Sequence, residues 1–386
     1  MIGAQIKSFL IALLSLCCML LAAPLMASPQ PEGAILGDPI RDVFDIPSQT
    51  TGSTYRIDVA LPNAYRIATN QRYPVIYVLD GQWLFPTASW VATGGLFDRS
   101  LPPAIVIGIS WKAPHDVMLG DRFRDFAPFP MLAAPTAGQA ASFRRFLREE
   151  LIPRIQKKYR AGPTRALVGL SLGGLFTFDT FVSEPDLFDI YVCDSPSLSF
   201  DDGSLKRRFD GLPKNFLHKP TRLLFSWGGA EALAGGIQSA GRELEARRFD
   251  LLKLRAGPVG EVGHAVSGVE AIAEGLTFGF SRDAIPLTDA SAREYAGNYS
   301  ANDGKFTTQI NAAGNLLTID FDDFGVPAKA VPLKQVGKDH LLAEANFIEV
   351  WIRRNETQKI DGADIVVEGT PMRLRRLDRR SGSTLP

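Results

Sequence analysis

From about residue 53 the chain alternates short apolar runs with stretches of helical periodicity. Most of these runs lack alternating polar residues, which is typical of strands that are covered on both faces in a parallel sheet. The segments predicted as strands are 55–61, 74–79, 104–109, 166–168, 190–192, 223–227 and 251–254. Between residues 140 and 158 the apolar side chains follow helical spacing, with a kink expected at Pro153. The alternation predicts an α/β domain with a doubly wound, mostly parallel sheet over residues 30–284.

The pattern changes after a short linker at residues 285–288. Beyond it, short apolar segments are separated by turn-forming residues, and helical periodicity is lost from about residue 295. The strands expected here are 305–310, 315–321, 340–343, 346–353 and 365–367. This pattern predicts a small all-β domain over residues 289–380, either a sandwich or a barrel. The arginine cluster at 373–380 is expected to form a solvated C-terminal edge.

The N-terminal segment has the pattern of a secretory signal peptide. Phe9 to Ala22 is almost unbroken apolar sequence, 14 residues long, which is short of the ~20 that a membrane-spanning helix needs. It is followed by Leu25-Met26-Ala27, an approximate cleavage site. We therefore predict that residues 1–27 are removed and that the protein is exported, periplasmic or secreted, with no membrane span afterwards. An uncleaved anchor is the alternative.

Composition narrows the class further. The 386 residues are 45% hydrophobic, which fits a folded globular chain, and 42 basic residues balance 42 acidic ones. No overall charge therefore attracts the chain to nucleic acid or to an anionic membrane. After cleavage Cys193 is the single cysteine, so no internal disulfide can form. It follows an apolar run, and we expect a buried, inert thiol there.

One motif carries chemistry. Residues 169–173 read Gly-Leu-Ser-Leu-Gly, a match to the G-x-S-x-G pattern. A predicted strand at 165–168 precedes the match and a predicted helix from Gly174 follows it. Strand, tight turn and helix form the context of a nucleophile elbow, in which the glycines allow a strained turn and a close approach of helix to strand. Ser171 is therefore the candidate nucleophile.

A serine hydroxyl needs a base to remove its proton. The chain has only four histidines. In this type of fold the nucleophile is followed along the chain by the acid and then by the histidine. His115 precedes Ser171, His340 lies in the β domain, and His218 comes before the strand that should carry the acid. His264, on a loop after the last predicted strand, is the candidate base.

The acid is expected just after the strand at 223–227, where Glu231 is the first carboxylate. In that position it could orient the imidazole and stabilise the imidazolium. The alternative role for Glu231 is an acid that favours the N-terminus of the helix expected at 232–247. Asp250 and Glu261 are the next candidates, and Asp194 lies one strand early.

The predicted oxyanion hole consists of two backbone N–H groups, those of Leu172 and Gln82. Leu172 follows the nucleophile directly, and Gln82 follows the strand at 74–79. The sequence contains no HExxH, CxxC or GxxxxGK[ST] motif. It therefore predicts no metal site and no cofactor.

Five segments occur together in an order that resembles the putative-esterase family of α/β-hydrolases. They are 73–81, 122–125, 146–153, 169–175 and 195–198. The family includes esterase D types, enterobactin-type siderophore esterases and mycolyltransferases. The resemblance covers about residues 40–280 and implies an α/β-hydrolase fold with Ser171, His264 and an acid that matches Glu231. The segment Tyr295–Tyr299 is similar to lipocalin-like β domains appended to bacterial serine hydrolases.

The siderophore-esterase branch is the most similar, through the Asp-Gly-Gln-Trp run that ends at Trp83 and the Ser-Pro-Ser run. Ala127 and the Leu198-Ser199-Phe200 segment depart from the family pattern. Candidate substrate-binding residues are Trp83 and, on a loop expected after the strand at 104–109, Arg122 and Arg124. The arginines could pair with anionic oxygens, although Arg124 could instead form a structural pair with Asp125.

The apolar, proline-rich segment 126–136 favours a short or aromatic acyl group over a trianionic siderophore. The sequence thus predicts an exported serine hydrolase of small-molecule carboxylic esters that works through an acyl-enzyme. An acyltransferase with the same triad and a catalytically inactive ligand-binding protein are the alternatives. The oligomeric state stays open.

Overall fold

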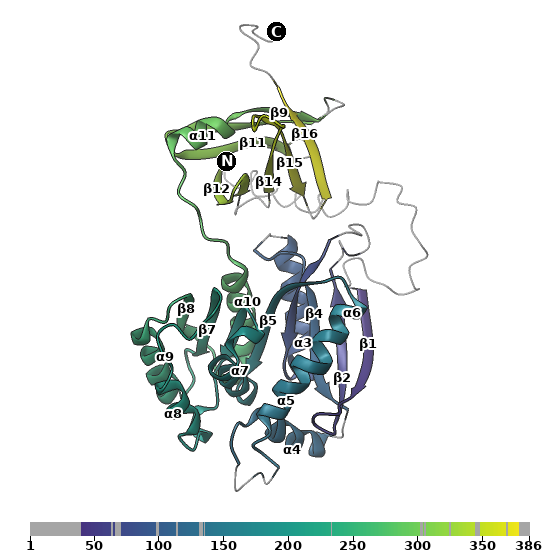
Figure 1. Ribbon diagram of the computed structural model, residues 1–386, viewed down its shortest axis with the longest axis vertical. Helices are drawn as coiled ribbons and strands as arrows, with labels where there is room; N and C mark the ends of the chain where they lie inside the picture. The colour runs from purple at the N-terminus through teal and green to yellow at the C-terminus, as the bar shows by residue number, and fades with distance from the viewer. Residues whose placement is uncertain are drawn as a thin grey trace, which may run out of the picture. The chain divides into compact units, whose positions relative to one another are not determined.

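A computed structural model describes residues 40–62, 65, 71–97, 100–112, 115–130, 134, 136–232, 234–301, 304, 306–323, 326–343, 348–367 and 370–377. The predicted signal peptide, residues 1–27, lies outside the described residues. The described chain contains an open α/β sheet followed along the sequence by a closed β-barrel (Figure 1). No described helix is long and apolar enough to cross a membrane.

The central sheet has eight strands in the order β1-β2-β4-β3-β5-β6-β7-β8. β1 and β2 are antiparallel to each other, β2 is antiparallel to β4, and the remaining neighbours are parallel. The predicted mostly parallel sheet is therefore confirmed. β1 was not expected, because this edge strand mixes polar and apolar residues. The strands are β1 Ile40–Pro47, β2 Thr54–Leu61, β3 Tyr73–Val78, β4 Ile105–Trp111, β5 Ala161–Leu170, β6 Ile190–Asp194, β7 Thr221–Gly228 and β8 Leu252–Val259.

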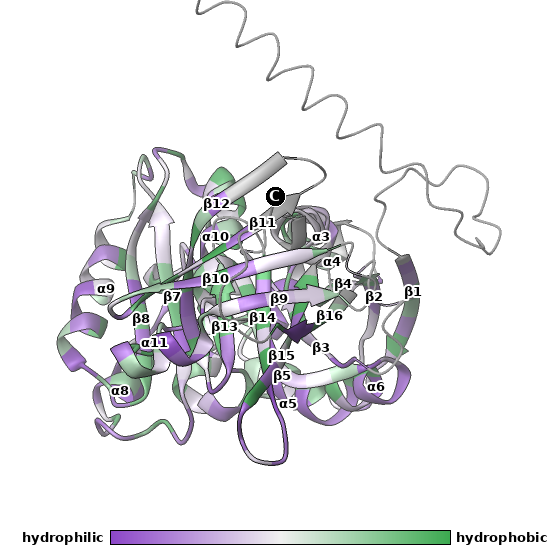
Figure 2. Cartoon of the chain, turned by 90° about the horizontal axis from the view of Figure 1, so that it is seen from above, coloured by the Kyte–Doolittle hydropathy of each residue, from purple (hydrophilic) through white to green (hydrophobic). Residues whose placement is uncertain are grey.

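Helices cover both faces of this sheet. α3 (Gly81–Phe97) and α10 (His264–Phe280) pack on one face. The other face carries α4 His115–Phe126, α5 Ala140–Phe146, α6 Ile152–Lys158, α7 Leu172–Ser183, α8 Ser204–Asp210 and α9 Gly235–Arg247. The continuous apolar strands follow from this, since Tyr77 of β3 faces one core and Val78 the other. The outer helices α8 and α9 mix hydrophilic and hydrophobic residues (Figure 2).

The expected irregularity at Pro153 takes the form of a π-helical turn, Leu147–Leu151, between α5 and α6. The N–H of Ile152 bonds to the carbonyl of Leu147, five residues back. Proline has no N–H, and its ring clashes with the carbonyl four residues before it in a regular α-helix. The wider turn lies directly before Pro153, where this clash would occur.

The C-terminal domain is a barrel, which decides between the two predicted all-β forms. Its strands close in the order β10-β11-β12-β13-β14-β15-β16-β9. They are preceded by α11 (Asp289–Tyr295) and span β9 Gly297–Ala301, β10 Thr307–Ala313, β11 Leu316–Asp323, β12 Val326–Gly337, β13 His340–Ala343, β14 Ile348–Arg354, β15 Ile360–Val367 and β16 Thr370–Arg376. The arginines expected at a solvated edge lie partly in β16, which pairs with β15 and β9. There Arg373 and Arg375 are exposed, whereas Leu374 between them is buried in the barrel core.

Candidate active site

The predicted strand, turn and helix around the G-x-S-x-G motif are present. Ser171 lies between β5 and α7 with φ 61° and ψ −117°, a conformation that non-glycine residues rarely adopt. A Cβ atom on Gly169 would lie 2.2 Å from the Gly173 carbonyl oxygen, and one on Gly174 would lie 2.4 Å from the Asp194 oxygen. Close backbone contacts therefore require glycine at position 169 of the motif and at position 174 just after it, on either side of the turn that carries Ser171 at the carboxyl end of β5.

The segment after β6 contacts the nucleophile from the side. The Ser171 hydroxyl oxygen lies 3.2 Å from the Ser197 hydroxyl oxygen. The backbone N–H of Ser171 donates to the Asp194 carbonyl, and that of Ser197 donates to the Ser171 carbonyl. The Ser-Pro-Ser run at 195–197 thus borders the serine directly.

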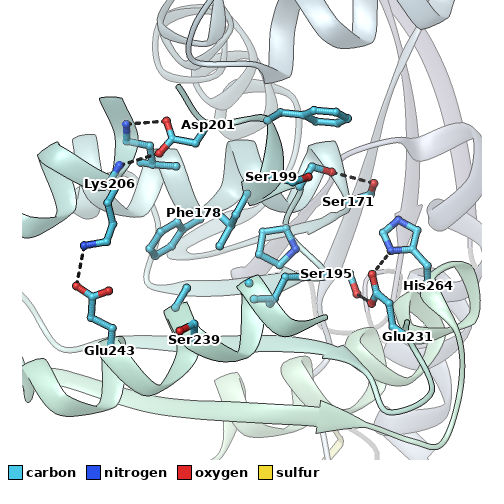
Figure 3. Close-up of a pocket in the computed structure, with 18 of the residues that line it drawn as sticks. Ser171, Phe178, Ser195, Ser199, Asp201, Lys206, Glu231, Ser239, Glu243 and His264 are labelled. Carbon is cyan, nitrogen blue, oxygen red and sulfur yellow. Dashed lines mark hydrogen bonds and ion pairs between the residues drawn. The ribbon is translucent and has the colours of Figure 1, made fainter. Parts of the chain in front are cut away.

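Glu231 and His264 contact each other just after the carboxyl ends of two neighbouring strands, β7 and β8. Glu231 lies in the turn after β7, and His264 begins α10. Nδ1 of His264 lies 2.7 Å from Oε1 of Glu231, so the other ring nitrogen, Nε2, is the one available to accept a proton. Figure 3 shows both side chains at the end of the pocket that also holds Ser171. The other candidate acids after these strands, Asp250 and Glu261, are exposed.

The Glu231 carboxylate is oriented by a buried serine. Ser195 is 1% exposed, has a φ of 39°, and donates from its hydroxyl to Oε2 of Glu231 at 2.6 Å. The N–H of Gly228 donates to the same oxygen at 3.3 Å. One carboxylate oxygen therefore faces His264 while the other is held in place. Sequence reasoning found the Ser-Pro-Ser run but assigned Ser195 no role.

Asp194, the acid candidate that lies one strand early, is buried next to these residues and accepts hydrogen bonds from serine hydroxyls. It is 1% exposed and accepts hydrogen bonds from Ser226 at 2.8 Å and Ser267 at 2.7 Å. The Ser267 hydroxyl also lies 3.3 Å from that of Ser195. Burial raises the pKa of Asp194, and the nearby Glu231 carboxylate acts in the same direction. Asp194 therefore belongs to a buried network beside the acid.

Replacing Ser195 by alanine is expected to lower kcat/KM for an ester about ten- to a hundredfold. The variant removes a hydrogen bond to a charged group, which is typically worth about 1.5–3 kcal/mol. Steady-state kinetics on a p-nitrophenyl ester test this, with Ser142→Ala, a serine in α5 outside the network, as the control. Unchanged kinetics in Ser195→Ala would show that Glu231 keeps its orientation without this bond.

The two predicted oxyanion donors lie at adjacent helix starts. Leu172 is the first residue of α7, and Gln82 is the second residue of α3. The first four N–H groups of a helix have no partner within it. β3 and β5 are neighbours, and a Cβ atom on Gly173 would lie 3.2 Å from Oδ2 of Asp80, the residue before α3. The two first turns are thus close together beside Ser171.

Arg122 and Trp83 lie near this turn, but the arginine is paired. The guanidinium of Arg122 makes two hydrogen bonds to the Asp80 carboxylate, at 2.8 and 2.9 Å, and lies 5.8 Å from the centre of the Trp83 ring. Trp83 is 48% exposed. Burial raises the pKa of Asp80, and Arg122 opposes this rise. The loop position predicted for Arg122 is wrong, because Arg122 lies in α4. There its guanidinium pairs with the buried carboxylate of Asp80.

Arg124, also in α4 rather than on a loop, has the geometry of a structural residue. Its guanidinium lies 2.7 Å from the Asp125 carboxylate and 2.6 Å from that of Asp121. Asp125 is fully buried and also accepts hydrogen bonds from Tyr55 and Trp111, both at 2.7 Å. These contacts favour the structural pair over a role in substrate binding.

The described residues of the apolar segment 126–136 are not among those that line the pocket. Phe126 and Phe129 are buried in the core, and residues 131–133 and 135 lie outside the described residues. The pocket, about 1040 Å³ in volume, instead lies among α7, α8, α9 and residues 195–201. Within the described ranges no cluster of three His, Cys, Asp or Glu side chains could hold a metal ion.

Cys193 has the environment predicted for it. It is fully buried in β6, and its Sγ lies 3.2 Å from the Gly174 carbonyl oxygen. Burial raises the pKa of its thiol well above the ordinary value. The thiol is therefore protonated and inert, as expected for a buried structural cysteine.

The known proteins to which this chain is similar include several esterases. Residues 48–232 match the sequence model of the family described as Putative esterase. This range contains Ser171 and Glu231 and ends before His264. Ferri-bacillibactin esterase BesA of Bacillus subtilis is 28% identical over 187 residues, which are 45% of this chain and 63% of the relative. The siderophore triacetylfusarinine C esterase of Aspergillus fumigatus is 30% identical over 38% of this chain and 52% of the relative. The chain thus spans about half to two thirds of the length of these relatives.

Solved structures share the fold. The BES protein from Bacillus cereus superimposes with a TM-score of 0.58 at 24% identity, over 66% of this chain and 99% of that one. Siderophore hydrolase EstA from Aspergillus nidulans gives a TM-score of 0.56 at 22% identity, over 67% and 98%. Both likenesses support an α/β-hydrolase fold.

Proposed function

We propose that this chain, an α/β-hydrolase whose residues 48–232 belong to the putative-esterase family, hydrolyses carboxylic esters with a Ser171–His264–Glu231 triad. The observation that carries the proposal is the 2.7 Å contact between Nδ1 of His264 and Glu231, at the pocket that Ser171 lines from a strained turn. A carboxylate on Nδ1 fixes the tautomer in which Nε2 can act as a base.

The reaction then follows from these positions. Ser171 Oγ attacks the ester carbonyl carbon while Nε2 of His264 takes the hydroxyl proton. The negative charge that develops on the carbonyl oxygen is stabilised by the N–H groups of Leu172 and Gln82. The C–O bond to the alcohol breaks, and His264 protonates the departing oxygen. Water, deprotonated by His264, then attacks the acyl carbon, the bond from that carbon to Ser171 Oγ breaks, and His264 returns the proton to Ser171 Oγ as the acid leaves.

The Ser197 hydroxyl can donate its hydrogen bond to Ser171 Oγ in this cycle, which leaves the Ser171 proton for Nε2 of His264. The His264 side chain is 46% exposed, so water can reach the base directly. Transfer to an alcohol would use the same acyl-enzyme and is recognised by a new ester product.

Two finer parts of the proposal rest on sequence. Export is proposed from the apolar segment and the cleavage-site pattern before residue 28. Siderophore esters are the alternative substrate class, because the Aspergillus fumigatus relative is named as a siderophore esterase and two bacterial relatives are named as esterases of ferri-bacillibactin and of apo-salmochelin. Neither part is needed for the ester chemistry itself.

A fluorophosphonate probe together with a panel of p-nitrophenyl esters tests the function. We expect the wild type to hydrolyse the esters and to gain one phosphonyl group on the peptide that contains Ser171. Ser171→Ala should be unlabelled, whereas Ser142→Ala, altered at a serine outside the pocket, should be labelled like the wild type. Labelling at another residue, or hydrolysis that survives in Ser171→Ala, would disprove the proposed nucleophile.

A further inference from the structure

We infer that the pocket beside Ser171 binds an uncharged, elongated apolar or aromatic group of the ester, and that it disfavours polyanionic esters. This inference rests on the proposed function and adds the chemical class of the substrate. Ser171 and His264 lie at one end of the pocket, and Lys206 and Glu243 lie at the other (Figure 3).

The pocket is elongated along two helices. Ser171, just before α7, and Phe178, seven residues further along, both line it, and α9 borders it from Gly236 to Glu243. Seven residues of α-helix correspond to roughly 10 Å at 1.5 Å per residue. An extended substituent on the ester can therefore lie along the pocket while its carbonyl stays at Ser171.

The wall of this pocket is largely apolar and firmly held. The larger apolar side chains that line it include Phe178 of α7, Leu205 and Phe209 of α8, Ile237 and Ala240 of α9, and Leu198 and Phe200 of the segment after β6. Most of them are buried members of the main core, so their positions are fixed by packing. An apolar group that displaces water from such a wall gains free energy in proportion to the area it covers.

The charges in the pocket favour an uncharged ligand. Lys206 is the one lysine or arginine among the described lining residues, and its Nζ lies 2.5 Å from Asp210 and 3.0 Å from Glu243. Asp201, Glu231 and Glu243 add carboxylates to the lining, and Asp201 accepts two backbone N–H bonds at the start of α8. A ligand with several negative charges would be desolvated here beside carboxylates and a cation already paired with two of them.

The two arginines proposed from the sequence for substrate binding do not alter this conclusion. Arg122 is bound to Asp80, and Arg124 is bound to Asp121 and Asp125. Neither belongs to the described lining of the pocket. Using either arginine for an anionic substrate would leave a buried carboxylate unpaired.

Two series of ester substrates, in which only the length of one chain changes, test the inference. One series varies the acyl group of p-nitrophenyl esters from acetate to octanoate, and a second varies the alcohol of acetate esters from methyl to octyl. We expect kcat/KM to rise about fourfold per added methylene group in at least one series until the pocket is filled. The p-nitrophenyl monoester of succinic acid, similar in size to the pentanoate but anionic, should be at least about tenfold poorer than the pentanoate.

Two adjacent glycines provide a matched pair of variants. Gly235 and Gly236 are the first residues of α9, and a Cβ atom on either would meet nothing within 4 Å. Only Gly236 lines the pocket. Gly236→Phe should abolish the gain in kcat/KM from chain length, whereas Gly235→Phe should keep both the acetate hydrolysis and the chain-length gain of the wild type.

The outcomes distinguish a failure of the inferred substrate class from a failure of the proposed ester hydrolysis. If the wild type hydrolyses acetate but shows flat series, or prefers the anionic monoester, the proposed substrate class is wrong and the ester chemistry stands. If Gly236→Phe keeps the full chain-length gain, the apolar group binds elsewhere. If no ester is hydrolysed, or Ser171→Ala is as active as the wild type, the proposed function itself fails.

Discussion

Replacing Ser171 by alanine is expected to lower kcat for p-nitrophenyl butyrate by at least about 10⁴-fold, the largest effect of any single substitution in this chain. Without the hydroxyl no acyl-enzyme can form, and only the contribution of substrate binding and the oxyanion donors remains. His264→Ala should lose a similar factor, because a neutral serine hydroxyl is a poor nucleophile. Steady-state and burst kinetics measure both losses.

The double variant gives the sharper test. Groups that act as one unit are not additive, so Ser171→Ala with His264→Ala should be no slower than either single variant. Glu231→Ala should lose less than either, since His264 keeps its place and loses only its orientation. If Glu231→Ala were unaffected while Asp194→Ala were inactive at equal stability, the acid would be Asp194 and the contact at 2.7 Å would have a structural role.

Local patterns predicted the fold and the reactive residues because their causes are local. The strands of the sheet are continuous apolar runs, since both faces are covered, and the elbow is a contiguous motif. His264 followed from chain order among four histidines. β1 and the barrel strands β9, β12 and β16 escaped prediction because polar or basic residues alternate in them with the apolar ones.

Contacts between side chains that are far apart in the sequence could not be predicted from it. Arg122 and Asp80 are 42 positions apart, and Ser195 and Glu231 are 36 positions apart. A lone arginine near a binding edge suggests an anion site, and only the fold reveals that a buried carboxylate already holds it. In the same way, segment 126–136 suggested an apolar wall that α7, α8 and α9 supply instead.

The Arg122–Asp80 pair predicts a large loss of stability. Asp80 is buried, and the Arg122 side chain is 15% exposed. Arg122→Ala is expected to lower the free energy of unfolding by about 3–5 kcal/mol, because it leaves a buried carboxylate without its partner. Urea denaturation at neutral pH measures this loss. Asp80→Asn combined with Arg122→Ala should recover part of it, because the buried charge is removed with its partner.

The loss should depend on pH in a definite direction. Burial already raises the pKa of Asp80 above the ordinary value of 3.8, and removing Arg122 raises it further. Above the unfolded pKa, the folded Arg122→Ala variant then binds a proton that the unfolded chain does not, so its stability falls as pH rises through the folded pKa. The difference in the free energy of unfolding between the wild type and Arg122→Ala should therefore be smaller at pH 5 than at pH 8. A gap that widens on acidification would refute this account. Normal stability with a selective loss of anionic ester hydrolysis would instead make Arg122 a substrate-binding residue.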